Sequence, residues 1–317
     1  MGDNGGTSTI VKSANTLVDL GHDVYIVDSG KNKHTWTPLK AKHMIKTLPD
    51  ADAIIATGYK SASTTISAPE RCGIKCHWIR AWEHWQMSDQ QIVDKVLKQP
   101  TIKLVNSICL RNKLQEYGYD SHIVRPGYDF GYIFPLGLRN PKCPPVLGGL
   151  FRAGIHGKRK RTEWVLRAAS KIKKSLDGAR LFMFGSEPNP NNPVIDQYLR
   201  RPNMKQKCRF YNTVDIWLAP TMSEGLHLPP AEAMMTKCPV VGTTAPLSGM
   251  QDYLIDNETG IVTDDNMSSF IYGIMKFIKD INFRNQCGEN AGNKMLQLGD
   301  RETNMKKLIK ILENPNV

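Results

Sequence analysis

The sequence predicts an α/β protein made of two doubly wound domains. Short apolar runs typical of buried strands alternate with helix-like segments in both halves of the chain, and a stretch rich in Gly, Pro and aromatic residues, 127–145, lies between the halves. Strands that alternate with helices form parallel sheets with helices on both faces. At 317 residues the chain is long enough for two hydrophobic cores.

The first domain is expected over residues 1–135. A helix opens at Gly5 and Gly6, and a second helix with the sequence LRNKLQEYG ends at Gly118. The strand candidates of this half are apolar runs bounded by turn residues, namely 23–28, 53–58, 75–82, 102–107 and 122–127.

The second domain is expected over residues 136–300, with a last helix in 301–317. A basic run at 158–161 precedes a helix-like segment, TEWVLRAASKIKKSL. The strand candidates of this half are 146–151, 179–185, 215–220 and 239–244.

Composition and cysteine usage indicate a globular protein of a reducing compartment. Hydrophobic residues make up 40% and charged residues 23% of the chain, and the sequence has no apolar run of membrane-spanning length and no signal-peptide pattern. We therefore expect a cytoplasmic location. The 7 cysteines are odd in number and scattered, which argues against a disulfide framework. Cys72, Cys76 and His77 lack the further ligands that a metal site needs, so we expect them to be structural.

The formal charge of +12 favours anionic partners such as nucleoside diphosphates, acidic lipids or nucleic acid. The densest cluster is the run at 158–161, which is open to three interpretations: a solvated loop, a localisation signal or a phosphate-binding segment. Specific nucleic-acid binding would need aromatic residues interleaved with the basic ones on a recognisable module, and the sequence shows none.

The most informative segment is 221–242, TMSEGLHLPPAEAMMTKCPVVG. A buried strand ends just before it, and Pro229 and Pro230 predict the start of a helix, where a missing N–H is tolerated. The loop before this helix therefore directs backbone N–H groups and the positive end of a helix dipole at a ligand, which suits a phosphate. Glu232 in the first helical turn can accept hydrogen bonds from a diol such as ribose, and Glu224 from another hydroxylated group.

This segment resembles the E-x7-E region of the retaining GT-B glycosyltransferases of family four, the glycosyl transferases group 1. The resemblance includes both carboxylates, the glycine, the prolines and the following strand. It implies a GT-B fold, two Rossmann-like domains facing across a cleft, with the acceptor bound by the first and a nucleotide-sugar by the second. It also implies that Glu224 contacts the donor sugar, that Glu232 holds the ribose, and that Gly225, Leu226 and His227 line the donor. The alternative is that both glutamates are solvated charges at a helix end.

The resemblance extends, less closely, to other positions. It implies that Arg152 and Lys160 bind the donor diphosphate and stabilise it as it leaves, although Lys158 could serve instead and Arg161 stands where relatives have a glycine. Gly6, from the glycine pair of the first helix, is a further donor-binding candidate. In relatives a strand precedes that pair, so we expect the first strand of this domain to be missing, and we expect the last helix to pack back toward the first domain.

The family implies departure of the nucleoside diphosphate with retention of configuration, without a dedicated base, a catalytic metal or a cofactor. The pair Asp50 and Asp52 resembles a DxD metal motif of another fold, but we interpret it as the cap of the strand that follows. The family's acceptors are glycans or lipid-linked molecules, as in polysaccharide biosynthesis, which makes peripheral association with an anionic membrane a hypothesis.

The acceptor candidates lie in the aromatic segment RAWEHW at 80–85 and are Arg80, Trp82, Glu83 and His84. Core packing of the aromatic rings is an equally good interpretation. Two other functions stay open: a GT-B sugar-nucleotide 2-epimerase and a basic nucleic-acid-binding protein. The sequence does not indicate the donor base, the sugar, the linkage or the oligomeric state.

Overall fold

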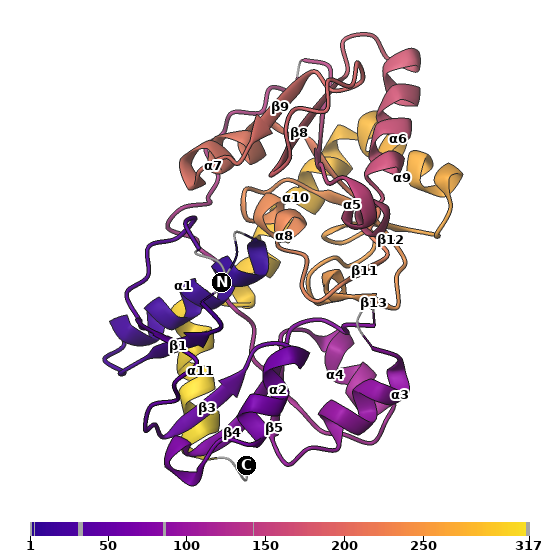
Figure 1. Cartoon of the computed structure of the whole chain (residues 1–317). Coiled ribbons are helices and arrows are strands. Elements are labelled where there is room, and N and C mark those ends of the chain that lie inside the picture. Colours follow the sequence, from indigo (N-terminus) through magenta and orange to yellow (C-terminus); the bar gives the residue numbers. More distant parts are fainter. Residues whose placement is uncertain (1, 3, 31–33, 85–86, 142, 315–317) are drawn as a thin grey trace. The chain divides into compact units, whose positions relative to one another are not determined.

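The computed structural model describes residues 2, 4–30, 34–84, 87–141 and 143–314 (Figure 1). The chain divides into two compact units. Unit 1 comprises Met1–Tyr128 together with Gly299–Val317, and unit 2 comprises Asp129–Leu298. The division at residues 128 and 129 lies inside the stretch that the sequence predicts as a linker.

Unit 2 contains a six-stranded sheet in which every neighbouring pair is parallel. The strands, from one edge to the other, are β14 (Gly260–Thr263), β12 (Val240–Thr243), β10 (Ile216–Ala219), β7 (Val146–Leu150), β8 (Arg180–Gly185) and β9 (Gln197–Arg200). The helices of this unit are α5 (Gly154–Lys160), α6 (Thr162–Ser175), α7 (Met204–Thr213), α8 (Leu228–Met235), α9 (Met267–Lys279) and α10 (Ile281–Gln297).

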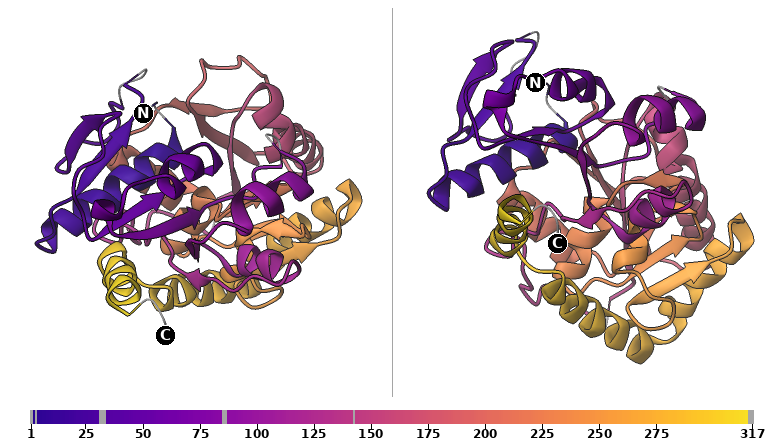
Figure 2. Two further views of the ribbon diagram at one scale, coloured as in Figure 1. Left: turned by 60° about the horizontal axis from the view of Figure 1, so that its bottom comes forward. Right: turned by 90° about the horizontal axis from the view of Figure 1, so that it is seen from below.

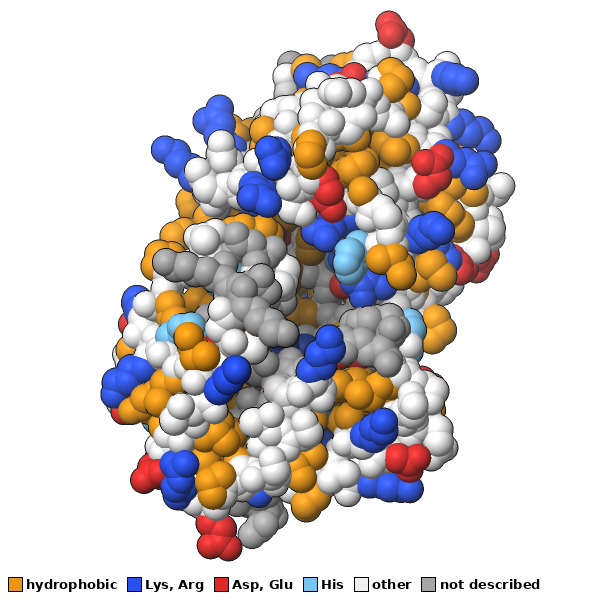
Figure 3. Space-filling view, in the orientation of Figure 1, with side chains coloured by type: hydrophobic (Ala, Val, Ile, Leu, Met, Phe, Trp, Pro, Cys, Tyr) orange, Lys and Arg blue, Asp and Glu red, His pale blue; other side chains and the backbone are white. Residues whose placement is uncertain are grey.

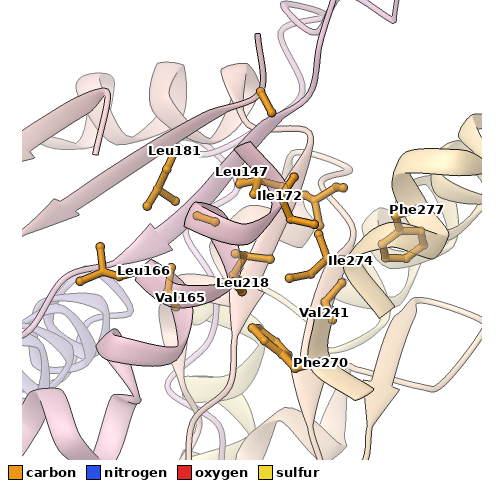
Figure 4. Packing of buried hydrophobic residues seen from close by; sticks show 14 of the residues in the cluster. Leu147, Val165, Leu166, Ile172, Leu181, Leu218, Val241, Phe270, Ile274 and Phe277 are labelled. Carbon is orange, nitrogen blue, oxygen red and sulfur yellow. The ribbon is translucent and has the colours of Figure 1, made fainter. Parts of the chain in front are cut away.

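The sheet of unit 2 has an apolar core on each face, because successive side chains of a strand point to opposite sides. Leu181 and Leu218 belong to the cluster that α6 and α9 cover (Figure 4). Phe184 and Trp217 point the other way and join the rings of α7, with ring centroids 5.8 Å apart for Phe184 and Tyr211. Helices on both faces make unit 2 a doubly wound domain, as predicted.

Unit 1 contains two separate parallel sheets in its described residues. The strands are β1 (Tyr25–Asp28) with β2 (Lys42–Ile45), and β3 (Ala53–Ala56), β4 (Ile74–Ile79), β5 (Ile102–Val105) and β6 (His122–Ile123) in that order. The α-helices are α1 (Gly5–Asp19), α2 (Tyr59–Ile66), α3 (Asp89–Ile92), α4 (Ile108–Gln115) and α11 (Arg301–Glu313). No strand precedes α1 in the described part of the chain, and β1 and β3 belong to different sheets.

The last helix, α11, packs inside unit 1 beside α1 (Figures 1 and 2). Its Met305 and Leu308 are buried in the apolar cluster that also contains Trp78. The guanidinium of Arg301 donates to the carbonyl oxygen of Pro126 at 2.6 Å. Gly127 lies so close to this helix that a Cβ there would meet the Arg301 Cα at 2.2 Å, and its φ of +75° is one that glycine tolerates best.

Some elements agree with the sequence prediction and others differ from it. The segment TEWVLRAASKIKKSL forms α6, but the basic run at 158–161 is not a loop, since α5 includes its first three residues. The strands β2, β9 and β14 were not expected from the sequence. All 7 cysteines are free thiols. Among the described residues, no helix combines the length and the apolar character needed to span a bilayer.

Candidate functional site

The segment singled out by the sequence forms a tight connection between β10 and α8. A two-residue strand, β11 (Ser223–Glu224), pairs with β13 (Leu247–Ser248), and α8 then begins at Leu228. His227 caps the helix in a left-handed conformation, with a φ of +60°. The hydroxyl of Tyr253 donates to the carbonyl oxygens of Leu226 and His227, at 3.1 and 2.7 Å, and so fixes the loop.

The first turn of α8 has fewer donors than an ordinary helix start. Pro229 and Pro230 have no N–H, so the backbone donors at this end belong to residues 225–228. The loop itself is packed closely: a Cβ on Gly249 would lie 2.2 Å from the carbonyl oxygen of Gly225. An anion approaching this end would meet few but rigid N–H groups.

Glu224 is held by the end of α5. The Lys160 Nζ lies 2.8 Å from its Oε1 and the Arg159 Nη2 lies 3.5 Å from the same atom. The side chains of Glu224 and Lys160 are each 13% exposed, and burial lowers the pKa of the Lys160 ammonium although Glu224 opposes this effect. The carbonyl oxygen of Arg159 accepts the backbone N–H of Met222 at 3.0 Å, which ties α5 to the loop. The structure thus brings together two of the residues that the sequence assigns to the donor.

His227 is buried beside these cations. It is 6% exposed, and its Nδ1 has no hydrogen-bond partner among the described residues. Burial, followed by the charges of Lys160 and Arg159, holds the pKa of His227 well below its usual range. The ring is therefore neutral at pH 7 and presents an unused polar atom next to the start of α8.

The carboxylate of Glu232 is bound by two side chains of α7. The Lys207 Nζ lies 2.6 Å from its Oε1 and 2.7 Å from its Oε2, and the Tyr211 hydroxyl donates to Oε2 at 2.7 Å. The side chains of Lys207 and Glu232 are 18% and 13% exposed. Burial and the nearby carboxylate raise the pKa of the Tyr211 hydroxyl well above its usual range. The sequence does not predict either partner of Glu232.

Arg152 follows β7, and its side chain contacts the loop that follows β8. Its Nε lies 3.1 Å from the Glu187 Oε1, and its Nη1 donates to the Ser186 hydroxyl at 2.9 Å. Arg152 and Lys158 line a surface hollow of about 570 Å³ in unit 2, whereas Lys160 points to Glu224. The two candidate lysines, Lys158 and Lys160, therefore contact different parts of unit 2.

Arg161 has a left-handed backbone conformation, which glycine adopts most easily. Its φ is +52°, in the left-handed region. The side chain forms an ion pair with Asp265, and its guanidinium carbon lies 4.4 Å from the centroid of the Trp164 ring. These two contacts hold the side chain of Arg161 at the turn between α5 and α6.

The acceptor candidates lie in unit 1 and are mostly engaged in packing. Trp82 is 2% exposed, stacks on Tyr117 with centroids 5.8 Å apart, and donates to the Asp89 Oδ1 at 2.8 Å. Both the ring and its N–H are thus used internally, which favours the core-packing alternative for this residue. Arg80 donates to the carbonyl oxygen of Gly6 at 2.8 Å. Gly6, a candidate for binding the nucleotide-sugar, therefore also lies in unit 1.

Two candidates follow Trp82 in the chain. Burial raises the pKa of the Glu83 carboxyl, and His84 follows it as the last described residue before the gap at residues 85 and 86. Trp85, the second tryptophan of RAWEHW, lies outside the described residues.

The described residues contain no group of three His, Cys, Asp or Glu that could hold a metal ion. Asp50 is exposed and its Oδ1 lies 2.6 Å from the Arg71 Nη1, while Asp52 directly precedes β3. Burial, with a smaller effect of Lys103, lowers the pKa of His77 to about 4.

The basic side chains do not form one continuous patch on the face shown in Figure 3. Lys and Arg side chains are spread over both units there, with apolar and acidic side chains between them. On this face the described basic side chains therefore form no continuous track of the kind that a nucleic acid follows.

A family model matches a large part of unit 2. Residues 148–280 match the family model of the glycosyl transferases group 1. No curated protein matches the chain by sequence.

Several solved structures have the same fold over the whole chain. Sucrose-phosphate synthase from Thermosynechococcus elongatus is 14% identical, with a TM-score of 0.76 over 98% of this chain and 93% of that one. Anabaena HepE in complex with UDP and glucose is 11% identical, with a TM-score of 0.75 over 98% and 96%. WaaG, a glycosyltransferase involved in lipopolysaccharide biosynthesis, is 13% identical, with a TM-score of 0.71 over 99% and 97%. The chain has the GT-B fold, as the sequence predicts.

Proposed function

We propose, from the match of residues 148–280 to the group 1 glycosyltransferases, that the protein transfers a sugar from a nucleoside-diphosphate donor to a hydroxylated acceptor. Unit 2 binds the donor. The observation that carries the proposal is the ion pair of Lys160 with Glu224, 2.8 Å long, next to the start of α8. A nucleotide-sugar needs cations for its diphosphate and acceptors for its sugar hydroxyls, and this pair supplies both.

In this proposal the diphosphate lies between Lys160 and the backbone N–H groups of residues 225–228. As the bond between the anomeric carbon and the diphosphate oxygen breaks, negative charge grows on that oxygen and is stabilised by the fixed cation and dipoles. Glu224 accepts from donor-sugar hydroxyls, and Glu232 accepts from the ribose. Transfer with retention follows if the leaving phosphate oxygen takes the proton of the attacking hydroxyl on the same face.

The acceptor that we propose is a glycan or a lipid-linked molecule in the cytoplasm. The net charge of +12 favours peripheral contact with an anionic membrane surface, where such acceptors are held. Binding to phosphatidylglycerol vesicles at low salt, lost at high salt, supports this part of the proposal. No binding at low salt contradicts it without affecting the donor site.

The donor site is tested by thermal shift with UDP, GDP, ADP, dTDP and CMP. A ligand that binds only the folded state raises the melting temperature by mass action. UDP is the first choice, because a structure of similar fold contains it. We expect one nucleotide to stabilise the protein, and Lys160→Gln to lose most of the shift.

Lys158→Gln is the matched control, since Lys158 is exposed two residues earlier on the same helix. Equal losses in the two variants would mean that the diphosphate does not bind at Lys160. No shift with any nucleotide in the folded wild type would refute the donor site. If a shift is found, NMR of the product formed on a sugar acceptor decides between retention and inversion, and formation of an epimer without transfer identifies an epimerase instead.

A further inference from the structure

Glu232 has little free hydrogen-bonding capacity. A carboxylate offers about four lone-pair sites. Lys207 and Tyr211 use three of them, through contacts of 2.6, 2.7 and 2.7 Å. One acceptor site is left on a residue that the proposed function asks to hold both hydroxyls of a ribose.

Lys207 supplies what Glu232 lacks. An ammonium group has three N–H donors, and the two contacts with Glu232 use two of them. The pair therefore presents one remaining donor beside one remaining acceptor. Each hydroxyl of a vicinal diol can both donate and accept, so one hydroxyl pairs with the ammonium and its neighbour with the carboxylate.

The surroundings keep the pair in this geometry. Lys207 and Tyr211 are one turn apart on α7, so both side chains lie on one face of the helix. Tyr211 is fully buried among the rings of the unit 2 core, whereas Lys207 and Glu232 keep exposures of 18% and 13%. The hydroxyl of Tyr211 anchors the carboxylate from the buried side, and the ammonium remains within reach of a ligand.

We propose that Lys207 is a specificity-determining residue of the donor site, which together with Glu232 recognises the vicinal diol of the donor's ribose. This inference rests on the proposed function. It assigns to Lys207 the discrimination between ribonucleotides and deoxyribonucleotides. A purely structural ion pair between α7 and α8 would not discriminate, because it would contact no ligand.

The test is the ratio of two dissociation constants, that of a deoxy compound divided by that of UDP, measured within each variant. Dissociation constants of UDP, 2′-deoxy-UDP and 3′-deoxy-UDP are determined by calorimetry, or those of the corresponding three compounds of whichever base stabilises the protein. In the wild type we expect both deoxy compounds to bind about tenfold or more weakly, as for the loss of a hydrogen bond to a charged group. In Lys207→Met we expect the ratio for one deoxy compound to fall to about one, while the ratio for the other, bound through Glu232, persists.

Lys205→Met is the matched control, because Lys205 is an exposed residue of the same helix. Its ratios should equal those of the wild type. If Lys207→Met fails to fold, Lys207→Arg keeps the charge but shifts the donors, and its ratio should still fall.

Three results would overturn the assignment of Lys207. Wild-type protein could bind UDP and both deoxy compounds equally. Lys207→Met could melt earlier yet keep both ratios, which identifies a structural ion pair. Lys207→Met could bind all three compounds more tightly by the same factor, which would mean that Lys207 competes with the ribose for Glu232. In each case UDP still binds, whereas failure of the proposed function would remove UDP binding altogether.

Discussion

The two units of this chain are built from the same alternation of strands and helices but differ in how continuous their sheets are. Unit 2 has six of its eight described strands in one sheet, and the other two, β11 and β13, form a short pair; a large apolar cluster lies between the six-stranded sheet and the helices α6 and α9. Unit 1 divides its described strands between a pair and a group of four, and the described apolar residues include two smaller clusters. The proposed donor site lies on the unit with the six-stranded sheet.

The difference shows how each unit completes its core. Unit 2 is formed by one continuous stretch of the chain, Asp129–Leu298. In unit 1 the larger cluster is completed by Met305 and Leu308 of α11, from the other end of the chain. Unit 1 therefore depends on contacts between residues far apart in sequence. Four variants test whether the stability of unit 1 is separate from that of unit 2.

The largest effect is expected from the double substitution Met305→Ala with Leu308→Ala. Both side chains are 1% exposed or less, and truncating two such residues should lower the free energy of unfolding of unit 1 by about 5 kcal/mol. That is close to the whole stability of a small domain. Hydrogen exchange measured by mass spectrometry should show loss of protection in β4 and β5 but not in β10 and α8. Equal loss in both units would contradict separate stabilities.

Leu218→Ala is the counterpart in unit 2. This side chain is 2% exposed in the cluster beneath α6 and α9, so its truncation should lower the stability of unit 2 by about 4 kcal/mol. Chemical denaturation together with hydrogen exchange locates the effect. Leu296→Ala, at a residue of α10 that is 62% exposed, is the control and should change stability by less than about 0.5 kcal/mol.

Acid should weaken unit 1 through His77. Its pKa is lowered to about 4 in the folded state, chiefly by burial, so below pH 6.5 the unfolded chain binds the proton more readily. Stability should fall as the pH drops from about 6.5 toward 4, by roughly 3 kcal/mol in total. His77→Leu should flatten this dependence in unit 1, as followed by hydrogen exchange at pH 7.5 and 5. An unchanged pH profile in that variant would rule out His77 as the cause.

The smallest effect at neutral pH is expected from His227→Gly in unit 2. Glycine relieves the left-handed conformation and removes the unpartnered ring nitrogen, while the packing of the ring is lost. We expect a net change within about 1 kcal/mol in thermal melts at pH 7.5. Between pH 7.5 and pH 5 the wild type should lose more stability than the variant, because the pKa of His227 is lowered in the folded state. A loss above about 2 kcal/mol at pH 7.5 would mean that ring packing dominates.

The sequence predicts most of the fold because the buried strands are continuous apolar runs. The runs at 146–151 and 215–220 correspond to β7 and β10, and α8 begins one residue before the predicted proline. The edge strand β9 has the sequence QYLR, with both outer residues exposed, so it shows no apolar pattern. The strand β2, KHMI, is missed for the same reason.

The residues of the candidate site are only partly indicated by the sequence. The motif identifies Glu224 and Glu232, because both belong to one short segment with recognisable spacing. The resemblance indicates Lys160 as a diphosphate ligand but not as the ion-pair partner of Glu224. No local pattern indicates Lys207, and both lysines lie on helices other than α8. Only the fold shows which lysine meets which carboxylate.

The membership of α11 in unit 1 also has a consequence for protein synthesis. Residues 129–298 leave the ribosome before α11 does, so the whole of unit 2 is available to fold during translation. The strands of unit 1 are made first, but Trp78 receives the side chains of Met305 and Leu308 only after the helix has emerged. The region translated earliest is thus the last to be completed, and in the meantime its apolar surface is exposed to chaperones.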